Sequence, residues 1–263
     1  MSTNQPREQP RHFQSTLVRN SHNPARLQIH RVGKWFRTLW LCLTAEKGEL
    51  VGALMGDKGT FKVQRRHGFY GGYDLSKYTR CAMSVCLGKD KDWGDHLASL
   101  LFKSYGVRGS TYLDGHEWRF WSSSTRAFQD LSEYYKPEWN CHSWCVTEPI
   151  FSAMPDAKEG VVRGYFDADG YPHFSKARNQ VSLKATSTNR LGVESMKKLL
   201  ATIGYNAGVY RRYSNSEVWE LCIARQQDVL RFYVQIGFSI RRKQARLAAM
   251  LARKGLILGK GVE

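Results

Sequence analysis

Two aspartates, Asp57 and Asp169, end two similar stretches of sequence and are the residues best placed to do chemistry. Small residues recur every four positions before each of them. They are Gly52 and Gly56 in the first stretch, and Gly160, Gly164 and Ala168 in the second. Residues four apart share one face of a helix, and a face of small residues lets two backbones approach closely. We therefore expect two packed helices, related by a pseudo-twofold axis, that bring Asp57 and Asp169 together.

This arrangement of the two carboxylates calls for a cation. A carboxylate at a helix C-terminus lies at the negative end of the helix dipole, and two facing carboxylates also repel each other. A site of carboxylates, backbone carbonyls and water suits Mg²⁺, which typically takes one or two carboxylates together with substrate phosphates. The pattern therefore predicts a metal-dependent phosphodiester site where two similar halves meet.

The charge of the chain favours a polyanionic partner. Its 263 residues carry 40 Lys and Arg against 23 Asp and Glu, a formal net charge of +17. Such an excess is typical of proteins that bind nucleic acid, although general basicity for solubility is the alternative. The 42% hydrophobic content is enough for one large core or two smaller ones and excludes a disordered chain.

Other classes of protein find little support in the sequence. The six cysteines show no paired zinc-ligand spacing, so reduced core thiols are expected. No apolar run approaches the length of a membrane span, and the N-terminus has no signal-peptide pattern. These features predict a soluble, intracellular protein.

Composition and repeated patterns divide the chain into four segments. They are a basic arm and leading extension at 1–43, a first half at 44–148, a linker at 149–156 and a second half with a basic C-terminal helix at 157–263. Thr44 is the expected cap of the first helix, and Asp156 with Glu159 forms a capping-box pattern for the second.

Each half shows the same order of elements, αββαββα, which predicts an α+β fold. Polar and apolar residues alternate at 61–66, 80–87 and 180–186, as in strands with one dry and one polar face. Helices are expected at 96–105 and 193–203, each ending before a glycine, followed by hairpins at 112–120 and 210–219 and closing helices at 125–135 and 226–236. Trp118 and Trp219 occupy inward strand positions. A basic helix is expected at about 241–254.

These residues resemble the LAGLIDADG homing endonucleases in their single-chain, two-motif form. The stretch from Val162 to Gly170 is close to the family motif along its whole length, and the run from Gly237 to Gln244 resembles the segment after the last helix of the repeat. Motif, strand order and spacing agree over roughly residues 44–253.

The resemblance implies a fold, a partner and an activity. The fold would be a pair of saddle-shaped antiparallel sheets around two central motif helices, in a monomer. The activity would be site-specific cleavage of double-stranded DNA, intron-encoded in many relatives, with both strands cut across the minor groove. Two or three Mg²⁺ ions would be shared by the motif aspartates, Mn²⁺ would substitute, and Ca²⁺ would allow binding only.

The resemblance also implies site residues. The metal ligands would be Asp57 and Asp169, with the carbonyls of Gly56 and Ala168. A basic residue near the site would come from each half, Arg241 in the second and Lys136 in the first. The polar sheet faces would contact DNA through Lys62, Gln64, Arg66, Arg80, Ser84, His173, Ser175, Gln180, Ser182, Lys184, Arg211 and Tyr213. Arg242 and Lys243 are either DNA-backbone contacts or a solvated helix start.

Two positions depart from a simple reading of the motif. Lys58 follows the first aspartate where a glycine is expected, with Gly59 one residue later, which predicts an enlarged turn. Asp167 lies on another side of the helix than Asp169, so it is interpreted as a partner for basic residues or a surface charge.

A second function stays open on the same scaffold. The chain is either an active endonuclease or an inactive nucleic-acid-binding protein, such as an RNA maturase or a transcription regulator. Retention of both motif acids favours the enzyme. An intein is disfavoured because the chain has no starting cysteine and no terminal His-Asn pair.

Overall fold

The computed structural model describes residues 42–56, 59–65, 69–70, 73–74, 79–137 and 139–257. The predicted arm therefore lies outside the described residues except for Cys42 and Leu43. The first half comprises α2 (Ala45–Met55), β1 (Thr60–Arg65), β2 (Phe69–Tyr70), β3 (Tyr73–Asp74), β4 (Thr79–Gly88), α3 (Lys91–Tyr105), β5 (Ser110–Asp114), β6 (Glu117–Ser122) and α4 (Thr125–Leu131). After α5 (Glu148–Phe151), the second comprises α6 (Pro155–Asp169), β7 (Gly170–Ser175), β8 (Gln180–Ser187), α7 (Arg190–Thr202), β9 (Ala207–Arg211), β10 (Trp219–Ile223), α8 (Gln226–Arg231), the π-helix η2 (Phe232–Ile236) and α9 (Arg241–Arg253).

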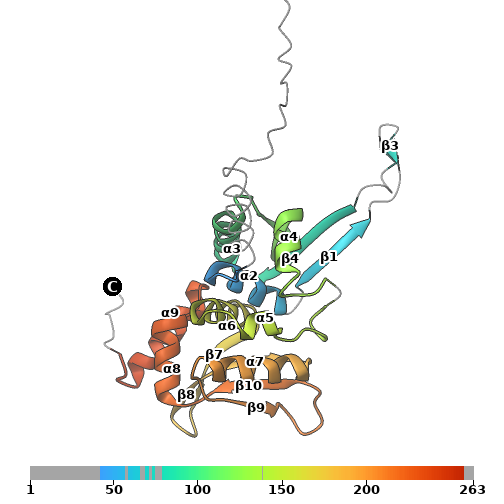
Figure 1. The fold of residues 1–263 in the computed structure, drawn as a ribbon. Coiled ribbons are helices and arrows are strands. Elements are labelled where there is room, and N and C mark those ends of the chain that lie inside the picture. The colour runs from blue at the N-terminus through green and yellow to red at the C-terminus, as the bar shows by residue number, and fades with distance from the viewer. Residues whose placement is uncertain are drawn as a thin grey trace, which may run out of the picture. The chain divides into compact units, whose positions relative to one another are not determined.

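The two halves build the same antiparallel sheet. The first has the strand order β1-β4-β6-β5, and the second has the order β7-β8-β10-β9. Each sheet is covered on one face by helices, and the pair α2 and α6 lies between the halves (Figure 1). The α+β fold with tandem repeats and two central helices is therefore confirmed. The short hairpin β2–β3 is inserted between β1 and β4 of the first repeat only, among the residues described.

The contact between α2 and α6 depends on the small residues. A Cβ atom on Gly52 would lie 2.1 Å from the carbonyl oxygen of Val161, and one on Gly164 would lie 2.1 Å from that of Glu49. Both distances are far inside van der Waals contact, so only glycine allows the two backbones to approach this closely. The contacts are reciprocal, as a pseudo-twofold axis requires.

Equivalent residues of the two repeats show where the chain accommodates the extra residue that follows Asp57. Within the motif helices, Gly52 corresponds to Gly164, an offset of 112 residues. At the start of the first strand, Gly59 takes the place of Gly170: a Cβ on Gly59 would lie 2.5 Å from the oxygen of Leu54, and one on Gly170 2.6 Å from that of Phe166. The offset there is 111, so the first turn is one residue longer. Asp57 and Lys58 themselves lie outside the described residues.

The helix starts show one confirmed cap and one correction. The hydroxyl of Thr44 accepts a hydrogen bond from the backbone N–H of Lys47, as predicted for the cap of α2. The second motif helix begins earlier than the capping-box pattern predicted, with Met154 at the cap and Pro155 at the first helical position. Proline is favoured there because its missing N–H has no helical acceptor in any case. Asp156 lies in the first turn. Part of the predicted linker is the short helix α5.

Most of the predicted elements are present with shifted ends. The Asp-Gly signal forms the β5–β6 hairpin, in which Gly115 has a φ of 63°. The helix α4 is shorter than predicted, and the helix after β10 changes from α to π at Phe232. Trp118 and Trp219 are partly buried rather than core, with Lys91 and Arg190 over their respective rings. Val63, expected on a dry face, is 50% exposed.

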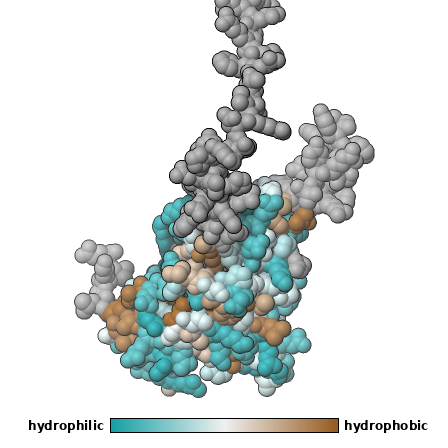
Figure 2. Space-filling view, in the orientation of Figure 1, coloured by the Kyte–Doolittle hydropathy of each residue, from teal (hydrophilic) through white to brown (hydrophobic). Residues whose placement is uncertain are grey.

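The face of the described residues that Figure 2 shows is mainly hydrophilic. In the view of Figure 2, the described surface shows small separate apolar groups, one of them at the C-terminal end of α9. Among the described residues, no helix is long and apolar enough to cross a membrane.

Candidate metal site and nucleic-acid interface

Asp169 is the last residue of α6 and lies where the two motif helices meet. A Cβ atom on Gly56 would lie 3.2 Å from Oδ1 of Asp169 and 2.2 Å from the Cβ of Ala168. The carboxylate therefore borders the end of α2, one residue before Asp57 in the chain. The expected pairing of Asp57 with Asp169 stays a prediction, since Asp57 is outside the described residues.

A pocket of about 280 Å³ opens beside Asp169 and is lined by both halves of the molecule. Its walls are Cys86, Leu87, Gly88, Asp90, Trp93 and Glu117 from the first half, and Asp167, Ala168, Asp169, Ile240, Arg242 and Lys243 from the second. Arg242 is held by Asp90 through two hydrogen bonds of 2.6 and 2.7 Å. This pair joins the start of α9 to the first half, next to the motif carboxylate.

Lys243 is buried at the end of the second motif helix. Its Nζ donates to the carbonyl oxygens of Phe166 and Asp167, at 3.2 and 2.5 Å. Burial lowers its pKa to about 8, although the negative charges of Asp167 and Asp169 oppose that shift. The side chain is therefore a structural cation that faces the candidate site. The sequence left two alternatives for Lys243, a solvated helix start and a contact to the DNA backbone. Its buried position fits neither.

Asp167 is a buried residue and not a surface charge. Only 1% of it is exposed, and its carboxylate accepts hydrogen bonds from the backbone N–H groups of Ser239 and Ile240 at 3.0 and 3.2 Å. Burial and the nearby charge of Glu49 raise its pKa to about 7. The prediction that it points away from Asp169 agrees with these contacts, but its partners are mainly backbone amides.

The two basic residues predicted near the site lie elsewhere. The side chain of Arg241 is 91% exposed, and its Nε is 3.9 Å from Asp92. Lys136 is exposed after the end of α4, with its ammonium 5.7 Å from the centroid of the Trp139 ring. Neither lines the pocket beside Asp169, whose cations are Arg242 and Lys243. Successive residues of a helix point about 100° apart, so Arg241 and Lys243 face different directions. The roles of Arg241 and Lys136 near the site stay predictions.

A buried carboxylate at the helix pair was missed. Glu49 is 2% exposed and lies at the position of α2 that corresponds to Val161 in α6. Its oxygens contact the ring Nε2 of His96 at 2.7 Å, the hydroxyl of Ser239 at 2.6 Å and the guanidinium of Arg163 at 3.4 Å. Burial raises its pKa, but these partners outweigh that effect and the pKa lies below its ordinary value. The sequence signal that could have revealed this carboxylate is a glutamate among the small residues that recur along the first motif helix.

The polar face of the second sheet forms a hollow of about 510 Å³. Five predicted contact residues line it, namely His173, Ser175, Gln180, Ser182 and Lys184, together with Arg178, Tyr210, Glu220, Cys222 and Ala224. Lys184 donates to Glu220 at 2.7 Å. Burial lowers the pKa of Lys184, but the hydrogen bond and charge of Glu220 outweigh it and the pKa is raised. The hollow therefore offers polar side chains that can donate or accept hydrogen bonds, with one embedded carboxylate.

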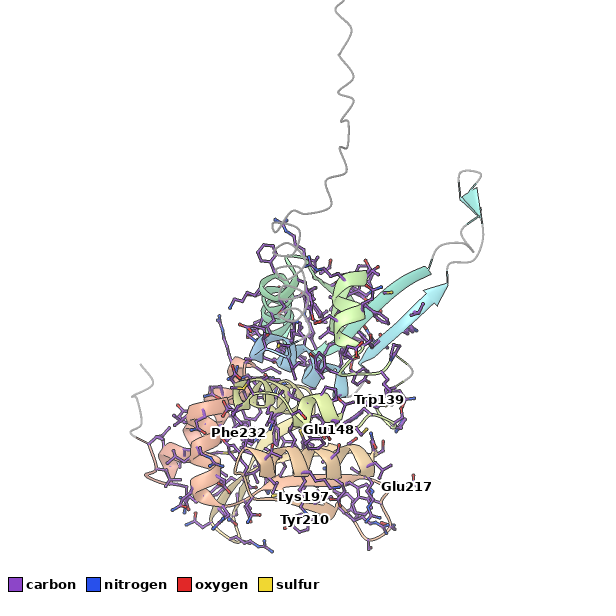
Figure 3. The ribbon with its side chains drawn as sticks, viewed as in Figure 1. Trp139, Glu148, Lys197, Tyr210, Glu217 and Phe232 are labelled. Atoms are coloured by element: carbon purple, nitrogen blue, oxygen red, sulfur yellow. The ribbon has the colours of Figure 1, made fainter. Side chains whose placement is uncertain are left out.

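Strand parity was wrong for one of the predicted residues. Arg211 pairs in register with Trp219, and its guanidinium lies 5.3 Å from the centroid of that ring, on the helix-covered face. Tyr210 pairs with Glu220 and lies on the hollow face of β9 (Figure 3). Tyr213 lies beyond the strand, in the turn, and is 62% exposed.

The first sheet supplies fewer described contact residues. Lys62 is exposed on β1, whereas Ser84 is buried and its hydroxyl lies 3.0 Å from that of Thr60. Gln64 and Arg80 are register partners in β1 and β4. Arg66 lies outside the described residues.

The donor set around Asp169 suits a hard divalent cation. Carboxylate and carbonyl oxygens meet at the negative end of a helix, and Lys243 already occupies two of the carbonyls. Among the described residues, no group of three or more metal-ligating side chains occurs. Asp57, which would complete such a site, lies outside the described residues.

Comparison with known proteins places the chain in a structural context. Residues 156–237 match the family model of the LAGLIDADG-like domain. The structure of I-DmoI in complex with DNA and Ca is similar at a TM-score of 0.55 and 14% identity, covering 79% of this chain and 98% of that one. I-DmoI with DNA and Mn gives a TM-score of 0.53 at 14% identity, covering 74% and 97%.

A variant of I-DmoI with its target DNA and Mg gives a TM-score of 0.52 at 14% identity, covering 74% and 96%. No curated protein sequence matches the chain significantly. At this identity the likeness establishes the fold. Residues 156–237 are thus similar to the LAGLIDADG-like domain, and the chain as a whole has the two-repeat fold of the homing endonuclease I-DmoI.

Proposed function

We propose that this protein is a site-specific double-stranded DNA endonuclease that uses Asp57 and Asp169 with divalent metal ions. The observation that carries the proposal is the position of Asp169. Its carboxylate borders Gly56, at the ends of two closely packed helices that lie between two sheets with polar faces. The net charge of +17 and the polar hollow of the second sheet, which contains Lys184 and Arg178, support a polyanionic substrate.

The chain's own residues would bind and orient the substrate. The polar faces of the two sheets would lie along the major groove, with Lys62 in the first half and Lys184 and Gln180 in the second contacting phosphates or base edges. The scissile phosphates would then lie at the junction of α2 and α6. Glycine contacts fix the separation of these helices, so the two aspartates would be held at a constant distance.

The metal would be held by the carboxylates of Asp57 and Asp169, with the carbonyls of Gly56 and Ala168 as further oxygen donors. When bound, divalent ions supply an activated water and stabilise the leaving oxygen in phosphodiester hydrolysis. I-DmoI has been solved with DNA and Mn, with DNA and Ca, and as a variant with target DNA and Mg, which supports testing these three ions here.

The proposal is tested by selecting bound duplexes from a randomised DNA library in Ca²⁺ and then exchanging Ca²⁺ for Mg²⁺ or Mn²⁺. Wild type should cut both strands of the selected duplex after the exchange. Asp57→Asn and Asp169→Asn should bind within a few-fold of wild type and cut at least roughly 100-fold more slowly.

Asp156→Asn is the matched control, because this aspartate lies in the exposed first turn of the same helix as Asp169. It should bind and cut like wild type. Binding without cleavage by the wild type would instead identify an inactive binding protein, whether a maturase or a regulator. Normal cutting by both motif variants would remove the aspartates from the chemistry.

A further inference from the structure

Among the described residues that line the hollow of the second sheet, Glu220 on β10 supplies the carboxylate. Its side chain is 13% exposed. One carboxylate oxygen accepts a hydrogen bond from Nζ of Lys184 at 2.7 Å, and the other accepts one from the hydroxyl of Tyr171 at 3.3 Å. Lys184 and Tyr171 are register partners on β8 and β7, so the neighbouring strands hold the carboxylate in one orientation.

The carboxylate and its lysine partner retain hydrogen-bonding capacity. An ionised carboxylate accepts at about four lone-pair sites, and an ammonium group has three N–H donors. The hydrogen bonds from Lys184 and Tyr171 use two of the acceptor sites, and the bond to Glu220 uses one N–H of Lys184. The hollow therefore presents an acceptor and a donor side by side, within a volume of about 510 Å³.

The first repeat shows that the fold does not require a carboxylate at this position. Glu220 pairs in register with Tyr210. In the first sheet a tyrosine again, Tyr112, pairs with Arg119 at the corresponding position. Arg119 carries the opposite charge, and its Nε lies 2.7 Å from Oδ2 of Asp114. The same sheet geometry therefore accepts either charge, so the acceptor in the hollow needs a reason beyond folding.

The chemistry of base edges supplies that reason. A carboxylate on a surface that meets DNA weakens the attraction for phosphates, because like charges repel. In the major groove, however, cytosine presents its N4 amino donor next to the O6 acceptor of the paired guanine, whereas thymine presents a methyl group. A carboxylate accepts from N4 and a lysine donates to guanine. The acceptor and donor in the hollow therefore match the two edges of one C·G base pair.

We propose that Glu220 is a specificity-determining residue that accepts from the amino group of a cytosine in the DNA target, while Lys184 donates to the guanine of the same base pair. Tyr171 keeps the carboxylate oriented. This inference rests on the proposed function for the identity of the substrate and names one base pair of the target. It requires sequence-specific binding, whereas it does not require cleavage.

The test is selection of bound duplexes from a randomised library in Ca²⁺, with wild type and with Glu220→Gln. Wild type should select cytosine at one position of its target. The isosteric amide can pair with both N6 and N7 of adenine, so Glu220→Gln should select adenine there and leave the other positions unchanged. Glu194→Gln is the matched control, because it makes the same substitution on α7, which covers the other face of this sheet (Figure 1). It should select the wild-type sequence.

A second measurement uses wild type alone and so does not depend on the folding of a variant. N4-methylcytosine at the selected position replaces the major-groove hydrogen of the amino group by a methyl group. It should weaken binding by roughly 5- to 100-fold, the range expected for one base-edge contact. The same modification at an unselected position of the same strand should leave the affinity near its original value.

The two readouts separate this inference from the proposed function. Full affinity for the methylated duplex, or the same base selected by wild type and Glu220→Gln, overturns the role of Glu220 even if the protein cuts DNA. A cytosine preference that changes to adenine in Glu220→Gln supports the role. If that change occurs but wild type does not cut after exchange of Ca²⁺ for Mg²⁺, the endonuclease function is overturned and the assignment of Glu220 stands.

Discussion

At the scale of single residues, Asp167 makes the stability of the fold depend on pH. Its carboxyl is buried, lies near Glu49 and has a pKa of about 7 in the folded protein, against an ordinary value near 3.8. A group whose pKa is raised by folding binds more protons in the folded state. Its contribution to stability is therefore fully present below about pH 4 and is lost as the pH rises through 7.

Asp167→Asn should remove this dependence. We expect the free energy of unfolding of wild type, relative to the variant, to fall by roughly 1–4 kcal/mol between pH 4 and 7. Taking the difference cancels the groups that the substitution leaves unaffected; Glu49 is not one of them, because its charge acts on Asp167. Urea denaturation across this range measures the effect. A difference that does not change with pH would show that Asp167 ionises normally.

The environment of single side chains was the part least accessible from the sequence. The spacing of small residues predicted that Asp169 ends a packed helix, because a period of four is a property of the chain itself. The burial of Asp167 and Lys243 depends on where α9 docks, and that is set by contacts between residues more than 70 positions apart. The same limit applies to Glu49, whose hydroxyl partner on Ser239 is 190 residues away.

At the scale of elements, the glycines between α2 and α6 decide whether the helix pair forms. Alanine in place of glycine normally stabilises a helix by about 1 kcal/mol. At Gly164 the added methyl would lie 2.1 Å from the backbone oxygen of Glu49, and a backbone atom cannot move aside as a flexible side chain can. Alanine at position 164 is therefore expected to destabilise the protein, although it would stabilise an isolated helix.

Gly164→Ala should destabilise the protein by more than about 3 kcal/mol, as measured by chemical denaturation. Gly106→Ala is a useful comparison, because Gly106 has a φ of 68° and open space around it. That variant tests backbone strain alone and should cost about 1 kcal/mol. Equal costs for the two substitutions would mean that the helix pair tolerates a wider separation than these contacts indicate.

Strand order and the hairpins followed from the sequence because alternation and turn residues are local signals. The sequence assigned Arg211 of β9 to the wrong face of the sheet. Tyr210 and Arg211 are both long side chains with a polar end, so the alternation of polar and apolar residues does not show which of them faces the helices. The start of α6 was misjudged for a related reason. Asp156 fits a capping box, but Pro155 is better suited to the first helical position.

At the scale of the whole molecule, the charge distribution predicts how binding responds to salt. The net charge of +17 is carried largely by Lys and Arg, and a protein that neutralises several phosphates releases their counterions. The logarithm of the DNA association constant should therefore fall linearly with the logarithm of salt concentration. A binding surface with six or more phosphate contacts would lose at least roughly 1,000-fold in affinity between 50 and 200 mM salt.

Lys62→Ala should identify the first sheet as part of that surface. Lys62 is exposed on β1, away from the helices α3 and α4 that cover the other face of the sheet. If it contacts a phosphate, its loss should reduce the slope of the salt plot by about 1 and weaken binding similarly on all target variants; a base contact would instead relax specificity at one position. Lys103→Ala removes another exposed lysine, from α3, and should leave the slope unchanged. The opposite result, with Lys103 rather than Lys62 changing the slope, would place the nucleic acid on the helical face and would exclude readout by the sheets.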